Sequence, residues 1–367
     1  MDFPQEVLGP QRVIFKRGSH TAIGREACEF GTRGVVVHGR SLEKNGFKDK
    51  IAKRFPRSSR VEFFCRPGGE PILEEITLVI ETARRIQAEW IVGIGGGSVL
   101  DLAKAAAGLY HAGEKPVFYQ EGGVLEKTGI PFIACPTTAG TGSEATPNSV
   151  IINPDKKTKL SIRDKSFMAR TVILDSELLK GLGRAVMSFA AMDAWVQAYE
   201  SYISKNATWY SETLALKAME LVSRHLFGAL DSGSAGDLDG ILLGSYLAGV
   251  ALASSRLGVI HGIAHPLGVL YDQPHGLVCS VCFVPSIRLN RQAMGEKYDT
   301  MSRAVGGDLV GRVGESLARL GISSPFKGKP VFEKEKIIQE TLQSGSTTAN
   351  PKPIVREDVE FILREIF

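Results

Sequence analysis

The alternation of short apolar runs with helical spacing over the first half most constrains what this chain can fold into. Residues 74–87, for example, place apolar side chains at the spacing of an amphipathic helix. The apolar runs are residues 34–39, 88–97, 131–138 and 169–175. Continuously apolar strands joined through helices are typical of a parallel sheet covered on both faces. The first half therefore predicts an α/β domain.

The second half, after about residue 178, has helical spacing and few strand signals. Its three longest helical runs cover residues 184–204, 209–230 and 237–268. Asp, Glu, Arg and His interrupt these runs, so we expect a helical bundle. The predicted domains are an α/β domain over 1–180 and a helical domain over 181–367.

Composition excludes several classes of partner. Lys and Arg number 44 and Asp and Glu number 40, and this small, scattered excess gives no reason to expect nucleic acid binding. We find no apolar stretch approaching the roughly 20 residues of a membrane span. The first residues lack the basic and apolar regions of a signal peptide. We therefore expect a cytoplasmic protein without a membrane partner.

The five cysteines are spaced irregularly, so a disulfide framework is not expected. Cys279 and Cys282 form a C-x-x-C pair inside an apolar run, and no second pair exists to complete a four-sulfur zinc site. We interpret them as buried structural thiols, with redox or metal function as the alternative.

A glycine-rich turn joins an apolar run to a helical one. Gly95, Gly96 and Gly97 are followed by Ser98, which we expect to cap the helix, with Asp101 completing a capping-box-like pair. Glycines let backbone N–H groups approach a ligand, and the helix dipole attracts an anion such as a pyrophosphate. The alternative is a tight turn that binds nothing. The turn matches neither G-x-G-x-x-G nor a Walker A loop.

A second polar loop follows the apolar run at 131–138. It offers hydroxyl groups suited to the wall of a nucleotide cleft, although such loops are common. The hydroxyl residues are Thr137, Thr138, Thr141 and Ser143.

An acid on a predicted helix and downstream histidines suggest a metal site. Asp193 is followed one helical turn later by Gln197, and the spacing places both side chains on one face. Spacing alone would choose His261 and His265, four residues apart, as a further pair of ligands.

Several motifs in this order resemble the iron-containing, or group III, alcohol dehydrogenase family. They are GGGSVLDLAK (95–104), PTTAGTGSEATPNSVI (136–151), VILDSELL (172–179), DAWVQAYESYIS (193–204), GVIHGIAHPLG (258–268), PHG (274–276) and SGSTTANPKPIVREDVEFIL near the end. The resemblance covers nearly the whole chain. It implies an N-terminal dinucleotide-binding α/β domain and an all-helical C-terminal domain, the dehydroquinate synthase-like architecture, with the active site between them. It also implies reversible hydride transfer between NAD(P) and a small alcohol or aldehyde, and at least a homodimer.

The resemblance also implies roles for individual residues. Asn148 is expected near the nicotinamide ring, and His265 beside the substrate as a polar or proton-relay group. The residues expected to hold the dinucleotide are Gly96, Gly97, Ser98, Asp101, Thr137, Thr138, Thr141, Ser143, Lys159 and Leu178. The positions matching the family's metal ligands are Asp193, Gln197, His261 and His275, of which Gln197 departs from the usual histidine.

The departure at Gln197 puts the metal, Fe or Zn, in doubt. A carboxamide oxygen is a poorer donor than imidazole for either ion. One carboxylate and two imidazoles could still hold Zn(II). The metal is therefore retained, weakened or lost, and replacement of the missing donor by His265 is an alternative.

Two further positions bear on specificity. In the family, Asp at the site occupied here by Gly39, Arg40 and Ser41 favours NAD, whereas small residues admit NADP. Arg40 could contact a 2′-phosphate, so we lean toward NADP and keep NAD open. Arg256, five residues before His261, would suit a carboxylate, phosphate or phosphonate on the substrate, or it faces solvent.

Two other functions are weighed against a dehydrogenase. Dehydroquinate-synthase-like cyclases share the glycine turn, but they usually carry a Glu–His–His metal set and more basic phosphate contacts. A catalytically silent homologue would bind the nucleotide without turnover.

Overall fold

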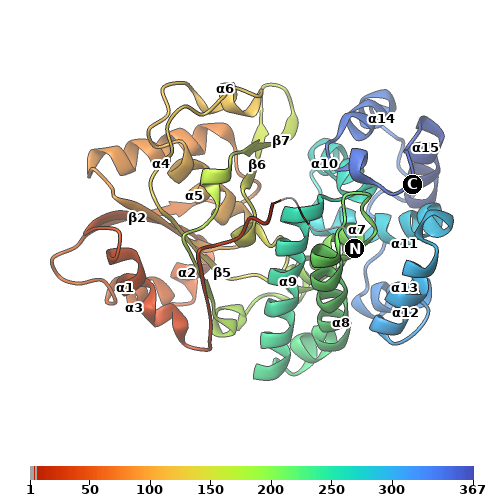
Figure 1. Cartoon of the computed structure of the whole chain (residues 1–367), viewed down its shortest axis with the longest axis horizontal. Helices are drawn as coiled ribbons and strands as arrows, with labels where there is room; N and C mark the ends of the chain where they lie inside the picture. The colour runs from red at the N-terminus through yellow and green to blue at the C-terminus, as the bar shows by residue number, and fades with distance from the viewer. Residues whose placement is uncertain (1–3, 5) are drawn as a thin grey trace. The chain divides into compact units, whose positions relative to one another are not determined.

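The computed structural model describes residue 4 and residues 6–367, and it divides into two compact units. An α/β unit spans Leu8–Leu182, and a helical unit spans Gly183–Phe367. Pro4, Glu6 and Val7 group with the helical unit, whereas the sequence placed them in the first domain. A parallel sheet followed by helices confirms the predicted fold class (Figure 1).

A six-stranded sheet forms the centre of the α/β unit, in the order β1-β8-β5-β4-β2-β3, and every neighbouring pair is parallel. The strands are β1 (Arg12–Phe15), β2 (Arg33–Gly39), β3 (Arg60–Arg66), β4 (Trp90–Gly95), β5 (Phe132–Pro136) and β8 (Thr171–Leu174). The sequence did not predict β1 and β3, which are partly exposed and whose apolar runs are only three residues long.

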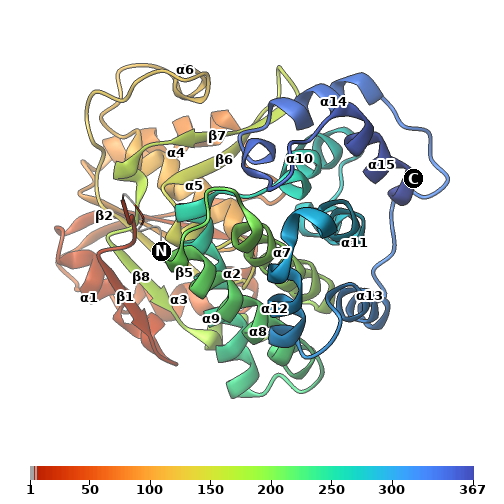
Figure 2. The same ribbon diagram turned by 45° about the vertical axis from the view of Figure 1, so that its right-hand side comes forward.

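Helices cover both faces of this sheet (Figures 1 and 2). Successive residues of β4 contact helices on opposite faces of the sheet. Trp90 and Val92 share a buried core with Ile23 of α1, whereas Gly93 faces Leu100 of α5. The helices are α1 (Ile23–Cys28), α2 (Arg40–Lys44), α3 (Phe47–Ala52), α4 (Leu73–Arg85), α5 (Gly97–Gly108) and α6 (Pro116–Gln120). A hairpin of β6 (Asn148–Asn153) and β7 (Thr158–Arg163) adds a small antiparallel sheet that was not predicted. Short 3-10 turns are η1 (Ser19–Ala22), η2 (Ser143–Ala145), η3 (Lys165–Phe167) and η4 (Ser176–Leu179).

The strand order places a change of direction between β2 and β4. After β2 the chain adds β3 on one side and then returns to add β4 on the other. Ligands of open parallel sheets bind outside the carboxyl ends of the strands at such a switch point. The turns after β2 and β4 are therefore where a dinucleotide site is expected.

Helices build the whole second unit. Its helices are α7 (Arg184–Ile203), α8 (Trp209–Asp231), α9 (Ala235–Ser255), α10 (Val259–Tyr271), α11 (His275–Met294), α12 (Glu296–Val305), α13 (Leu309–Leu320), α14 (Lys334–Gln343) and α15 (Arg356–Ile366), with the 3-10 turn η5 (Thr347–Ala349). Helices α7, α8 and α9 pack against one another, and α7 also packs against α11. Every residue of α7 from Ala191 to Ile203 is buried, so the polar residues on it lie inside the unit.

One helix corrects the expectation that no apolar stretch approaches the length of a membrane span. Helix α9 has 21 residues and a mean hydropathy of 1.4 over its most apolar window, enough by length and composition alone to cross a membrane. Of that window, 61% is buried inside the structure. Packing against α7 and α8 accounts for this apolarity.

Candidate active site

Three turns converge at the carboxyl edge of the parallel sheet. A Cβ atom added to Gly96, after β4, would lie 3.1 Å from the Thr138 hydroxyl oxygen, after β5. A Cβ on Gly97 would lie 2.5 Å from the Thr141 methyl group. A Cβ on Gly39, at the end of β2, would lie 3.6 Å from Val99 in α5. Close packing, with no positive φ angle at Gly95–Gly97, is therefore why this turn needs glycines.

The start of α5 differs from the predicted cap. Gly96 is the N-cap, and no side chain caps the helix. Ser98 lies inside the first turn, because the backbone N–H groups of Val99 and Leu100 already bond to the Gly96 carbonyl. The first turn of α5 therefore presents backbone N–H groups and the positive end of the helix dipole, as an anion site requires.

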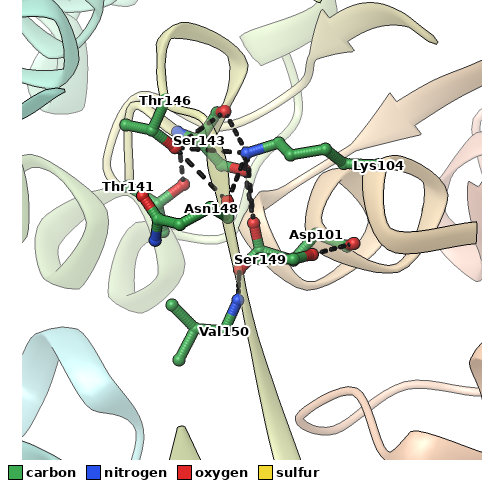
Figure 3. A network of polar contacts seen from close by, with 8 residues as sticks. All are labelled: Asp101, Lys104, Thr141, Ser143, Thr146, Asn148, Ser149 and Val150. Carbon is green, nitrogen blue, oxygen red and sulfur yellow. Dashed lines mark hydrogen bonds and ion pairs between the residues drawn. The ribbon is translucent and has the colours of Figure 1, made fainter. Parts of the chain in front are cut away.

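Asp101 also has a different role from the predicted capping pair (Figure 3). Its Oδ1 accepts a hydrogen bond from the Ser143 hydroxyl at 2.5 Å, and its Oδ2 accepts one from the Val150 N–H at 3.1 Å. Both Asp101 and Ser143 are buried. These two predicted cofactor residues thus tie the loop after β5 to α5 through their side chains.

Lys104 completes this network, and the sequence analysis missed it. Its ammonium group is fully buried and donates to the Ser143 carbonyl at 2.6 Å and to the Asn148 carbonyl at 2.7 Å (Figure 3). It also donates to the Thr146 hydroxyl at 3.1 Å. A lysine in the middle of an alanine-rich buried helix was the available signal, because a buried ammonium group needs partners.

Burial shifts the pKa values of the charged groups in this network. Burial, opposed by the carboxylates of Asp101 and Glu144, lowers the pKa of Lys104 to about 8. Burial raises the pKa of Glu144 to about 7 and also raises that of Asp101. The low-dielectric surroundings disfavour each charged form, so this loop is held by a polar network that is costly to disrupt.

The remaining predicted cofactor residues differ in their exposure to solvent. Arg40 and Ser41 are exposed in the first turn of α2, directly after β2. Lys159 lies on β7, where its ammonium group pairs with Glu70 at 3.1 Å. Leu178 is buried in the core beside the sheet. Thr137 is also buried, and its N–H bonds to the Gly95 carbonyl at 2.9 Å.

The predicted metal residues of the helical unit meet on three helices. Asp193 comes from α7, His261 from α10 and His275 from α11. Asp193 Oδ1 lies 3.4 Å from His261 Nε2 and 3.7 Å from His275 Nε2. Cys279, one turn after His275, joins them, and the ligand atoms of all four residues lie within 4.8 Å of one another.

A buried carboxylate orients His261. Glu200 Oε2 lies 2.7 Å from His261 Nδ1, and Glu200 Oε1 accepts from the Ile260 N–H at 2.6 Å. Burial alone lowers the pKa of His261, but Asp193 and Glu200 outweigh it and raise that pKa to about 9. With Nδ1 facing a carboxylate, the neutral imidazole presents its Nε2 lone pair to the cluster. Glu200 was not predicted, although it lies two helical turns after Asp193.

Gln197 contacts the cluster through its amide nitrogen. Gln197 Nε2 donates to Asp193 Oδ2 at 3.1 Å, whereas its Oε1 is buried without a hydrogen-bond partner. His265 is partly buried one turn after His261, and its ring centroid lies 5.4 Å from that of His275. Gln197 thus orients the carboxylate of Asp193.

The donor set fits a divalent transition metal. The His261 Nε2 atom is buried and accepts or donates no hydrogen bond, although Asp193 and His275 face it. Imidazole, carboxylate and thiolate are the usual ligands of zinc, and imidazole and carboxylate also bind Fe(II).

The two residues predicted near the substrate have distinct settings. Asn148 begins β6; its carbonyl accepts from Lys104, and its side-chain Oδ1 is buried without a hydrogen-bond partner. Arg256 is exposed directly after α9, with φ 63° and ψ −170°. This backbone region is essentially restricted to glycine.

Two family models match nearly the whole chain. Residues 10–176 match the family model for iron-containing alcohol dehydrogenase, and residues 187–367 match that for the Fe-containing alcohol dehydrogenase family, C-terminal. Lactaldehyde reductase of Escherichia coli (strain K12) is 32% identical, over 94% of this chain and 95% of that protein. NAD-dependent methanol dehydrogenase of Bacillus methanolicus is 27% identical, over 97% of this chain and 98% of that protein.

A third relative and a solved structure are also similar to this chain. Sulfoacetaldehyde reductase of Bilophila wadsworthia is 36% identical, over 76% of this chain and 72% of that protein. The crystal structure of a 1,3-propanediol oxidoreductase superposes with a TM-score of 0.92 at 26% identity, over 100% of both chains. The chain therefore belongs to the iron-containing alcohol dehydrogenase family and is an NAD(P)-dependent oxidoreductase of alcohols and aldehydes.

Proposed function

We propose that the protein catalyses reversible hydride transfer between nicotinamide C4 and the carbinol carbon of a small alcohol, with a divalent metal held by Asp193, His261 and His275. The observation that carries this proposal is the convergence of these side chains from three helices, with Asp193 Oδ1 3.4 Å from His261 Nε2. A bound metal would polarise the substrate oxygen and stabilise the developing alkoxide.

The chain's own residues have supporting roles in this proposal. Glu200 fixes the orientation of His261, and Gln197 fixes that of Asp193. His265, one turn after His261, is the proposed group that takes the hydroxyl proton during alcohol oxidation and returns it during aldehyde reduction. In oxidation the carbon loses a hydride to NAD(P)+ and the oxygen loses a proton, which leaves the aldehyde and NAD(P)H.

The dinucleotide is proposed to bind at the carboxyl edge of the sheet, with its diphosphate at Gly96–Ser98. Glycine packing and an uncapped α5 support this placement. Arg40 is exposed at the start of α2 and is the proposed partner of a 2′-phosphate, which favours NADP. Replacing Arg40 with Ala should raise the KM for NADPH and leave that for NADH unchanged. Equal KM values for NADPH before and after the change would contradict this preference.

The substrate is proposed to be a small aldehyde, and an anionic group on it would suit Arg256. The exposed guanidinium lies five residues before His261, and a relative is named as a reductase of sulfoacetaldehyde. We therefore expect a lower KM for aldehydes carrying a carboxylate or sulfonate than for neutral aldehydes of equal length.

A panel of small aldehydes tests the function. Purified protein is assayed with NADPH and NADH, with no metal, Zn(II) or Fe(II), and oxidation of the reduced dinucleotide is followed by absorbance. Metal-stimulated turnover supports the proposal. Dinucleotide binding without turnover on any aldehyde or alcohol would instead support the silent homologue.

A further inference from the structure

We propose that Cys279 is the fourth protein ligand of this metal, which makes the site sulfur-containing and selective for Zn(II). The inference rests on the proposed metal-assisted function and adds a ligand to the three histidine and aspartate donors assigned above. Four observations carry it: register, distance, the orientation of Gln197, and the contrast with Cys282.

The register of α11 brings Cys279 to the cluster. His275 is the first residue of the helix, and Cys279 follows four residues later, so both side chains occupy one face. Cys279 Sγ lies 3.5 Å from His275 Nε2. The thiol is fully buried and is not part of a disulfide. The sulfur therefore belongs to the same buried cluster of ligand atoms as the other three donors.

The distances match a tetrahedral metal site. Metal–ligand bonds of about 2.0–2.3 Å place the ligand atoms of a tetrahedron about 3.3–3.8 Å apart. Three of the separations are 3.4 Å for Asp193–His261, 3.7 Å for Asp193–His275 and 3.5 Å for Cys279–His275. The other three pairs of ligand atoms lie within 4.8 Å. Small side-chain adjustments would therefore bring all four atoms onto one ion.

Gln197 contacts Asp193 through its amide nitrogen. Its amide nitrogen, which has no lone pair for a metal, is the atom that faces Asp193. Reversing the amide would place its oxygen against the Asp193 carboxylate and would lose that hydrogen bond. Gln197 thus positions a ligand, and of the described His, Cys, Asp and Glu side chains only Cys279 joins Asp193, His261 and His275 in the cluster.

Cys282 shows what a purely structural thiol looks like in the same helix. It is fully buried three residues further on, and burial raises the pKa of its thiol. It is not a member of the metal-ligating group. The two cysteines share a helix and are both fully buried, so Cys282 is a matched control.

A thiolate changes the metal preference. Soft sulfur with two imidazoles favours Zn(II), whereas imidazole ligands without sulfur suit Fe(II) as well as Zn(II). Four protein ligands admit a substrate only by expansion to five, which catalytic zinc sites allow. We therefore expect Zn(II) to bind more tightly than Fe(II), and more so than in a variant without the sulfur.

Cobalt substitution tests the ligand directly. The full-length protein is loaded with Co(II), and its near-ultraviolet spectrum is compared among wild type, Cys279→Ser, Cys279→Ala and Cys282→Ala. Wild type and Cys282→Ala should show a thiolate-to-cobalt charge-transfer band that both Cys279 variants lack. Zn(II) affinity, measured by competition with a chromophoric chelator, should fall at least about tenfold in the Cys279 variants only.

A rescue variant keeps the test decisive if a Cys279 variant folds poorly. The double variant Gln197→His with Cys279→Ala places an imidazole one turn after Asp193 and should restore Zn(II) affinity without the charge-transfer band. Wild-type cobalt protein without the band, or a Cys279→Ala variant with unchanged Zn(II) affinity, would overturn the proposal. Metal-stimulated turnover in either case would leave the proposed dehydrogenase function intact.

Discussion

Among single residues, Glu200 is a buried side chain that orients a proposed metal ligand, His261. It bonds to His261 Nδ1 at 2.7 Å and to the Ile260 N–H at 2.6 Å. When a carboxylate holds the second ring nitrogen of a metal-binding histidine, mutating that carboxylate typically lowers metal affinity 10- to 100-fold. The Glu200→Gln variant should therefore bind Zn(II) about 10- to 100-fold more weakly by chelator competition. The exposed Glu357→Gln is the control, and equal affinity in the two variants would contradict this role.

Arg256 carries backbone strain at the end of α9. Its φ of 63° with ψ −170° is a conformation that costs a non-glycine residue about 1–3 kcal/mol. Arg256→Gly should raise the free energy of unfolding by about 1 kcal/mol, measured by urea titration. Ser254→Gly, inside α9, should lower it, because glycine destabilises a helix interior. Destabilisation by Arg256→Gly would show that this residue is not strained.

The same variant separates stability from specificity. If Arg256 contacts an anionic substrate, Arg256→Gly should raise the KM for anionic aldehydes and leave that for neutral ones unchanged. A stabilised variant whose KM is unchanged for both anionic and neutral aldehydes would indicate that Arg256 faces solvent and does not contact the substrate.

At the scale of elements, a buried polar network joins α5 to the loop between β5 and β6. Lys104 and Asp101 hold Ser143 and the start of β6 (Figure 3). Glu144, the next residue after Ser143, is also buried. A loop fixed through its own side chains keeps Thr138 and Thr141 against the glycine turn. The network therefore preorganises the proposed dinucleotide site.

Glu144 makes the stability of this loop depend on pH. Burial raises its pKa in the folded protein to about 7, above the ordinary value of 4.5. The folded state then holds the proton more tightly, so this contribution to stability is complete below pH 4.5 and is lost as pH rises through about 7. Between about pH 5 and 7.5, the free energy of unfolding should fall more in wild type than in Glu144→Gln, as urea titration would measure. Parallel profiles for the two proteins would contradict this assignment.

At the scale of the whole molecule, the proposed metal site joins residues of α7, α10 and α11, which are separated in sequence. A ligand that binds only the folded state stabilises it, by about 2.7 kcal/mol at 100 times its dissociation constant. Removal of the metal should therefore speed hydrogen exchange in these three helices and leave β4 and α5 unchanged, as mass spectrometry would resolve. Equal exchange in metal-loaded and chelated protein would argue against a metal that bridges them.

The sequence by itself determined the two-part fold, because wholly apolar strands and long helical runs leave few alternatives. Through its resemblance to a known family, it also pointed to Asp193, His261 and His275 as candidate metal ligands. It did not predict β1, β3 or the β6–β7 hairpin, whose residues are partly exposed and whose apolar runs are no longer than three residues. The capping roles of Ser98 and Asp101 were wrong, because the Gly96 carbonyl and Ser143 satisfy the groups involved.

Tertiary structure alone decided which polar residues meet. Lys104 and Ser143 are 39 positions apart, and Glu200 and His261 are 61 apart, so no local spacing signals either pair. In the sequence, Cys279 is a cysteine in an apolar run with no sign of a ligand role. In the structure, α11 places its Sγ 3.5 Å from His275 Nε2. Periodicity in a sequence reports which face of an element is buried, whereas the partner of a buried polar group is set by how the elements pack.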